Sequence, residues 1–125
     1  MDQRDRDKIE KIIQDRRRAH EKLTDKGSAV YRAFLEMEKA AYSGNAISKM
    51  HKELIAVGIS LVLDCESCME WHIHQALKAG ADTEQILEAI EVGIEMGGGP
   101  ATVSSRFALN VLEYYSQAKP DGQSR

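Results

Sequence analysis

The sequence predicts an all-α protein built from six helices. Apolar residues recur at steps of three and four positions along most of the chain, which is the period of an amphipathic helix. Alternating patterns typical of strands are nearly absent, and the two prolines, Pro100 and Pro120, interrupt no periodic segment. With 125 residues, the chain has the size of one ordinary domain.

The first two predicted helices are more charged than the others. The first covers about residues 4–23, and Gly27 stops the chain from continuing as a helix. Ser28 can then cap the second helix. The second runs to about residue 42, and its expected buried side consists of Val30, Tyr31, Phe34, Leu35, Met37 and Ala41. We therefore expect residues 1–44 to form a helical extension that packs on the remaining helices.

Four further helices form the expected core. The third covers about residues 49–63, and its apolar side chains wrap most of its surface, so it should lie centrally. The fourth runs from near Cys65 to Gly80, and the other two follow it. Their ends are marked by Ser48, by a capping box of Asp82 and Gln85, and by Pro100 in a first turn after three glycines. We expect one domain over residues 1–118 and a disordered polar tail over residues 119–125.

Composition and charge argue against several classes of function. The net charge is -3, whereas a nucleic-acid-binding protein needs a basic face. The basic cluster Arg16 to Arg18 lies among acidic residues, so we interpret it as part of a solvated helix face with mixed charge. No run of about 20 apolar residues could span a membrane, and the charged N-terminus does not resemble a secretory signal. We therefore expect a cytoplasmic protein without nucleic-acid or membrane partners. In that compartment, paired cysteines are more often catalytic, redox-sensing or metal-binding than structural.

The segment that points to chemistry has the pattern Cys-x-x-Cys-x-x-x-His. On a helix Cys65, Cys68 and His72 fall within an arc of about 60° on one face. The spacing places the two cysteine Cα atoms roughly 5 Å apart, within the range for a disulfide. A disulfide that closes so small a ring should be readily reduced, which suits catalysis. The first turn of a helix favours a thiolate, and His72 can activate a thiol as imidazolium or as a base.

Glu53 lies twelve residues before Cys65, in the first part of the predicted central helix. If the third and fourth helices form an antiparallel hairpin, Glu53 is at a suitable height to face the second turn of the fourth. A bare carboxylate beside a thiol would raise the pKa of that thiol by like-charge repulsion. We therefore expect Glu53 to accept or relay a proton, or to hold His72 in its charged form.

Glu53 followed by Cys65-x-x-Cys68-x-x-x-His72 resembles the signature of the carboxymuconolactone decarboxylase superfamily, and within it the AhpD-like, alkylhydroperoxidase branch. The resemblance covers about residues 47–112. It implies an all-α AhpD-like bundle with a central antiparallel helix pair, and a homo-oligomer that is a trimer or a hexamer. It also implies that Cys68 is the peroxide-reactive thiol, that Cys65 is the resolving thiol, and that Glu53 and His72 form the proton relay.

The resemblance implies an antioxidant enzyme, a peroxidase or thiol-disulfide oxidoreductase that reduces hydroperoxides or disulfides and is restored by an external dithiol. We expect no cofactor. Two alternatives stay open. One is a metal-binding or sensing module whose ligands would be Cys65, Cys68, His72 and Glu53. The other is a decarboxylase-like family member without redox turnover.

Overall fold

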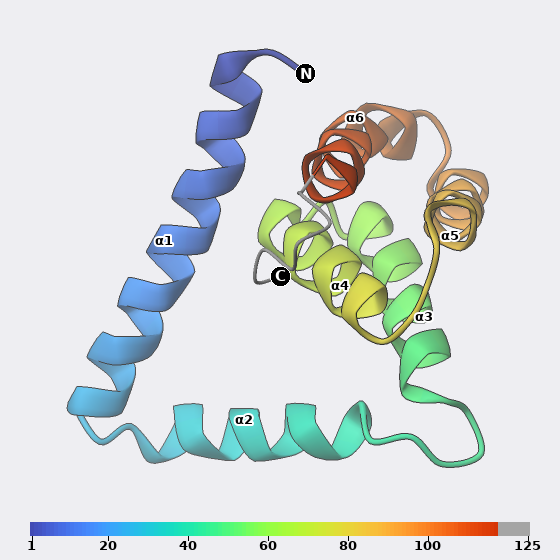
Figure 1. Ribbon diagram of the computed structural model, residues 1–125. Coiled ribbons are helices and arrows are strands. Elements are labelled where there is room, and N and C mark those ends of the chain that lie inside the picture. The colour runs from blue at the N-terminus through green and yellow to red at the C-terminus, as the bar shows by residue number, and fades with distance from the viewer. Residues whose placement is uncertain (118–125) are drawn as a thin grey trace.

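The computed structural model describes residues 1–117 and shows six α-helices and no strand among those residues (Figure 1). The helices are α1 (Gln3–Asp25), α2 (Ala29–Ala41), α3 (Lys49–Val62), α4 (Glu66–Lys78), α5 (Thr83–Gly97) and α6 (Gly99–Ser116). The predicted all-α class is confirmed, and the predicted helix ends differ from these bounds by one or two residues. The predicted tail, residues 119–125, lies outside the described residues. Within residues 1–117, no helix is both long and apolar enough to cross a membrane.

Local capping chemistry explains where the helices begin. The hydroxyl of Ser28 accepts the backbone N–H of Tyr31 at the start of α2, and Ser48 caps α3 in the same way. Asp82 and Gln85 form the predicted capping box at the start of α5. Pro100 lies in the first turn of α6, where its missing N–H costs nothing.

Helix α3 lies at the centre of the bundle and packs against α4, α5 and α6. The close approach of α3 and α5 depends on glycine, because a Cβ on Gly93 would lie 2.8 Å from the carbonyl oxygen of Gly58. The largest fully buried apolar side chains of the core are Ile9, Val57, Leu61, Met69, Ile73, Ile86, Ile90 and Val111. The short turn between α3 and α4 sends the chain back along α3, so the two helices run antiparallel.

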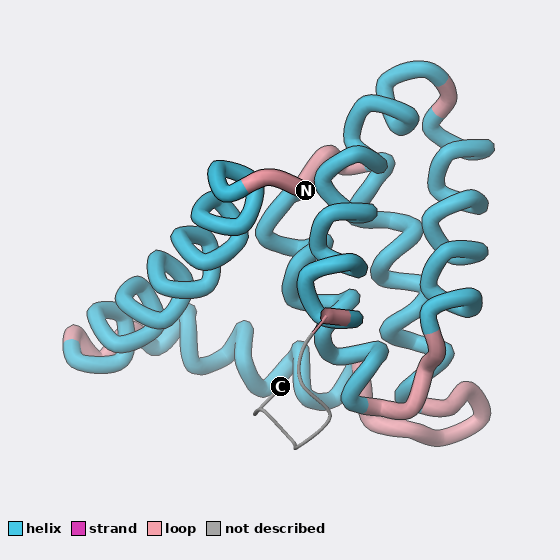
Figure 2. Tube along the Cα trace, turned by 45° about the horizontal axis from the view of Figure 1, so that its top comes forward, coloured by secondary structure: helices cyan, strands magenta, loops and turns pink. Residues whose placement is uncertain are grey.

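Helices α1 and α2 form an arm beside this bundle: Figure 1 shows α2 set apart from α3–α6, and Figure 2 shows α1, which begins at the N-terminus, leading away from the bundle. Helix α1 inserts the fully buried Ile9 into the core and contacts α4 and α6. Helix α2 buries none of its residues, so the predicted buried side is wrong: Val30 is 82% exposed and Met37 is 62% exposed. An apolar stripe shows which face of a helix avoids water, but not whether the same chain covers it.

The outer faces of the bundle also carry many exposed apolar side chains. The sequence predicts that apolar side chains wrap α3, yet several of them reach the surface together with apolar residues of α5 and α6. These exposed residues are Ile55, Ile59, Val62, Leu63, Leu87, Val92, Met96, Val103 and Leu109. Six of them, Ile55, Ile59, Val62, Leu63, Val92 and Met96, line one pocket. Exposed apolar side chains that gather in this way are typical of a surface that meets another molecule.

Candidate active site

The two cysteines lie at the turn between α3 and α4. Asp64 adopts a left-handed backbone conformation with φ 53°, and its side chain accepts a hydrogen bond from the hydroxyl of Ser104 at 2.7 Å. The next residue, Cys65, is the N-cap of α4, and its sulfur accepts the backbone N–H of Cys68 at 3.2 Å. Cys65 therefore caps the helix from outside, whereas the sequence argument treated it as a helical position.

Cys65 and Cys68 form a disulfide, and their Cα atoms are 5.2 Å apart. Both residues are partly buried. Cys68 lies in the first turn of α4, where the backbone N–H groups have no partner within the helix. These N–H groups and the positive end of the helix dipole stabilise negative charge on a cysteine sulfur once the disulfide is reduced.

Glu53 and His72 meet across the contact between α3 and α4. Glu53 is 2% exposed, and its Oε1 lies 2.7 Å from Nδ1 of His72. An ionised carboxylate can only accept hydrogen bonds, so we assign the proton of this contact to Nδ1 of the imidazole. The other ring nitrogen, Nε2, is then the atom of His72 that can exchange a proton with a reacting group.

Lys49 and Tyr42 complete the surroundings of Glu53 and His72. The ammonium of Lys49 lies 2.8 Å from Oε2 of Glu53, and the rings of Tyr42 and His72 are 5.1 Å apart at their centroids. Burial by itself would raise the pKa of Glu53, but the hydrogen bonds and charges of His72 and Lys49 outweigh it and lower that pKa. Glu53 is therefore a carboxylate at neutral pH. Burial raises the pKa of Tyr42, and the nearby charges of Glu53 and Glu38 raise it further.

A cleft of about 940 Å³ opens between α1, α2 and α4, beside the disulfide. Cys68 and His72, one helical turn apart on α4, both line it. Cys65 is not among its lining residues. Much of the remaining wall is apolar or aromatic and includes Ile12, Leu23, Phe34, Leu35 and Trp71. The cleft therefore opens onto the sulfur-bearing residue Cys68 and onto His72.

The structure brings the four predicted site residues into two linked pairs. Cys65 is bonded to Cys68, Glu53 is hydrogen-bonded to His72, and α4 carries a member of each pair. Across residues 1–117, no three histidine, cysteine or acidic side chains converge in a way that could hold a metal ion. Sequence reasoning missed Lys49, although its position one turn before Glu53 on the same helix was a usable signal.

Comparisons with known sequences extend the resemblance. The model of the carboxymuconolactone decarboxylase family matches residues 28–111, so the matched region begins with the cap of α2 and not at residue 47. An uncharacterised protein from the cox locus of Paracoccus denitrificans is 40% identical over 87 residues, which are 70% of this chain and 78% of that protein. An uncharacterised protein of Cupriavidus necator is 37% identical over 87 residues, 70% of this chain and 74% of that protein.

Two solved structures share this fold over about nine-tenths of the chain. A carboxymuconolactone decarboxylase family protein from Legionella pneumophila superposes with a TM-score of 0.84 at 29% identity, covering 89% of this chain and 99% of that one. A protein of the same family from Thermotoga maritima superposes with a TM-score of 0.82 at 27% identity, covering 91% and 97%. A role in the antioxidative response has been suggested for the Thermotoga protein.

Proposed function

Because this chain belongs to the carboxymuconolactone decarboxylase family, we propose that it is an AhpD-like thiol-disulfide oxidoreductase that reduces hydroperoxides or disulfides. One observation carries the proposal. The Cys65–Cys68 disulfide lies at the start of the helix whose next turn holds His72, and that imidazole is fixed by the buried Glu53. A cysteine pair, a proton acceptor and an ionised carboxylate that orients this acceptor are the parts that thiol redox catalysis needs.

In the first step, the reduced Cys68 gives its proton to Nε2 of His72. The Cys68 sulfur attacks the terminal oxygen of the hydroperoxide, so that an S–O bond forms while the O–O bond breaks. The leaving alkoxide takes the proton back from His72 and departs as an alcohol. Cys68 becomes a sulfenic acid, and the peroxide is reduced by the two electrons that Cys68 loses.

In the second step, the sulfur of Cys65 attacks the sulfur of the Cys68 sulfenic acid. An S–S bond forms, the S–O bond breaks, and the hydroxide leaves as water after taking the proton of Cys65. The disulfide of this structure is the product. An external dithiol then supplies two electrons and two protons by thiol-disulfide exchange. A cycle of this kind suits the reducing cytoplasm. The cytoplasmic location is a prediction from the sequence.

Glu53 acts on this cycle through His72. Its carboxylate holds the Nδ1–H, which leaves Nε2 directed to exchange protons and stabilises the imidazolium that forms when Cys68 is deprotonated. Lys49 keeps Glu53 ionised and so favours the same arrangement. A bare carboxylate beside the cysteine would raise the pKa of the thiol. Glu53 is instead hydrogen-bonded to the imidazole, so it acts on the thiol through His72.

A direct test is the reaction of the reduced protein with one equivalent of organic hydroperoxide, followed by mass measurement and thiol counting. We expect both thiols to disappear and the chain to lose the mass of two hydrogen atoms. In Cys65→Ser, Cys68 should stop at a sulfenic acid that dimedone traps, whereas Cys68→Ser should not consume peroxide. Persistence of both thiols under conditions that oxidise a control peroxidase would refute peroxide reduction. If the protein reduces a disulfide substrate but no hydroperoxide, its activity is that of a disulfide reductase.

We also propose that the chain forms a homo-oligomer, a trimer or a hexamer. The support is the amount of apolar surface that one chain leaves uncovered: α2 exposes Val30, Phe34 and Met37, and α3 and α5 expose a second apolar area. Burial of such side chains between subunits would be favourable at about 25 cal/mol per Å² of apolar surface. Sedimentation equilibrium should give a multiple of the 14.0 kDa chain mass, and a monomer at all concentrations would contradict the proposal.

A further inference from the structure

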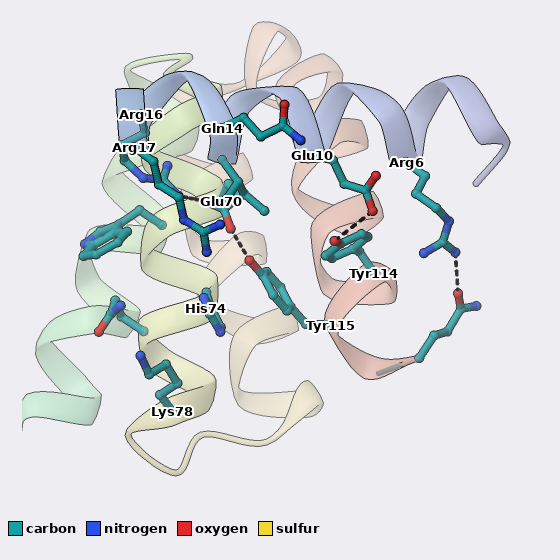
Figure 3. A pocket seen from close by; sticks show the side chains of 14 residues that line it. Arg6, Glu10, Gln14, Arg16, Arg17, Glu70, His74, Lys78, Tyr114 and Tyr115 are labelled. Carbon is teal, nitrogen blue, oxygen red and sulfur yellow. Dashed lines mark hydrogen bonds and ion pairs between the residues drawn. The ribbon is translucent and has the colours of Figure 1, made fainter. Parts of the chain in front are cut away.

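A second buried carboxylate, Glu70, lies on α4 between α1 and α6. It is fully buried, and Figure 3 shows Arg16 of α1 on one side of it and Tyr115 of α6 on the other. Arg16 forms an ion pair with one carboxylate oxygen, and the Tyr115 hydroxyl donates to the other. Burial raises the pKa of Tyr115 and the charge of Glu70 raises it further, so the phenol stays protonated and remains a donor.

Arg16 also reaches the segment between the two cysteines. Its second terminal nitrogen donates to the hydroxyl of Ser67 at 3.2 Å and to the Ser67 carbonyl at 3.4 Å. Its guanidinium lies 4.9 Å from the ring centroid of Trp71, a distance at which cation–π attraction is effective. Ser67 directly precedes Cys68, and Arg16 and Cys68 line the same cleft. One guanidinium thus connects a buried acid to the backbone of the disulfide ring.

These contacts require the geometry of arginine. A guanidinium is planar and carries five donors, so one of its terminal nitrogens can bind Glu70 while the other binds Ser67. A buried ion pair often stabilises a fold no better than apolar residues of similar volume. The stability of the fold therefore explains poorly why Glu70 is buried in the core. A more specific explanation is that Glu70 anchors Arg16 and fixes the direction of its guanidinium. The sequence interpretation of Arg16 as part of a solvated face is wrong, because Arg16 is partly buried and paired.

We propose that Arg16 is a positioning residue for the Cys65–Cys68 pair, an inference that rests on the redox function proposed above. Anchored on Glu70, Arg16 fixes Ser67 and so holds the backbone between the cysteines in the conformation that keeps their sulfurs together. In the reduced protein, this raises the local concentration of one sulfur at the other and favours closure of the disulfide. Helix α1, outside the segment that carries the motif, thereby contributes to the redox equilibrium of the pair.

The test is the equilibrium of the full-length protein with defined ratios of reduced and oxidised glutathione, quantified by alkylation and mass measurement. Exchange conserves electrons: the protein disulfide and two reduced glutathione molecules give the dithiol and one oxidised glutathione. Arg16→Lys keeps a positive charge for Glu70, but its one nitrogen cannot occupy the places of the two guanidinium nitrogens that bind Glu70 and Ser67 separately. We expect its disulfide to form about tenfold less readily, which makes the reduction potential about 30 mV less negative for two electrons.

A double variant, Arg16→Gln with Glu70→Gln, guards against misfolding. It removes both charges of the pair together, so that neither charge is left buried without its partner. We expect it to shift the potential in the same direction as Arg16→Lys. Ser67→Ala, at an exposed position, removes one of the two Arg16 contacts and should shift the potential by less. Agreement among these three variants would tie the potential to the Arg16–Ser67 contact.

Two controls separate positioning from general effects. Tyr115→Phe removes the other hydrogen bond to Glu70 and should lower stability while leaving the potential unchanged. Arg17→Gln removes a neighbouring, exposed positive charge and should change neither quantity much. A potential in Arg16→Lys and in the double variant equal to that of the wild type would overturn the inference. A wild-type disulfide that glutathione and dithiothreitol both fail to reduce would instead overturn the proposed function.

Discussion

The two buried carboxylates of this protein, Glu53 and Glu70, have partners of different kinds. Both are almost completely excluded from solvent, and both are contacted from neighbouring helices. Glu53 is bonded to an imidazole and to a half-exposed lysine, whereas Glu70 is bonded to a guanidinium and to a buried phenol. Of these partners, the imidazole has a second ring nitrogen that can take up and return a proton, whereas the phenol is held neutral by its burial beside Glu70.

This difference separates a group that can take part in proton transfer from one that can only hold structure. Glu53 can support a proton moving on and off His72, because the imidazole has two nitrogens and one of them remains available. Glu70 has no such route, since its partners are a guanidinium, which has donors but no acceptor, and a phenol that is held neutral. We therefore expect changes at Glu70 to appear mainly in stability and in the geometry of the disulfide. Changes at Glu53 should appear mainly in rate.

The largest expected effect follows from removing the acid that holds α1, α4 and α6 together. Glu70→Ala leaves Arg16 and the Tyr115 hydroxyl without their shared partner, and should lower the free energy of unfolding by about 3 kcal/mol. Denaturation in urea measures this difference. Glu70→Gln, which keeps an acceptor of the same shape, should cost less. Equal stability of Glu70→Ala and the wild type would show that Glu70 does not hold the three helices.

The next effect is kinetic and concerns Glu53. Glu53→Gln keeps the shape of the side chain but loses the charge that stabilises an imidazolium. We expect the rate of peroxide-driven disulfide formation to fall about 100-fold, which is about 2.7 kcal/mol in barrier height. Rapid-mixing fluorescence of Trp71 can follow the reaction. His72→Asn should give a similar loss, and the double variant should be little slower than either single one, because both residues act in one relay. Additive losses would contradict this relay.

The fold was largely accessible from the sequence because its determinants are local. Helical period and capping residues such as Ser48 and Asp82 act over a few positions, so they predict where each helix lies and begins. The exposure of α2 could not be predicted in this way. Whether Val30 and Met37 are covered depends on surfaces far along the chain or on another molecule, and a periodic pattern contains no information about either.

In the candidate site, too, the contacts between residues close in sequence were predictable and the contact between distant residues was not. Cys68 and His72 share one helix, so their spacing alone places them on one side, and the short turn after α3 brings Glu53 within reach. Arg16 contacts Ser67 from more than fifty positions away along the chain, and no local pattern in the sequence encodes that pairing. A charged residue in a basic run is usually solvated, and only the packing of α1 on α4 distinguishes Arg16 from its neighbours.

The smallest expected effect concerns the dependence of stability on pH. The pKa of Glu53 in the folded protein lies below its ordinary value of 4.5, so its ionisation stabilises the fold at pH values above 4.5. That contribution should disappear as the pH falls through the lower, folded pKa. Chemical denaturation at a series of acidic pH values should therefore show a steeper loss for the wild type than for Glu53→Gln, in which this group does not titrate.

Lys49→Met sharpens this test, because it removes one of the two hydrogen-bonding partners that lower the pKa of Glu53 and leaves His72 in place. Lys49 is half-exposed, so the loss of stability at neutral pH should stay below about 1 kcal/mol. The pKa of Glu53 should rise towards its ordinary value, so the acid-dependent loss should become smaller and be complete at a higher pH. An unchanged pH profile would mean that Lys49 does not contribute and that His72 alone lowers the pKa of Glu53.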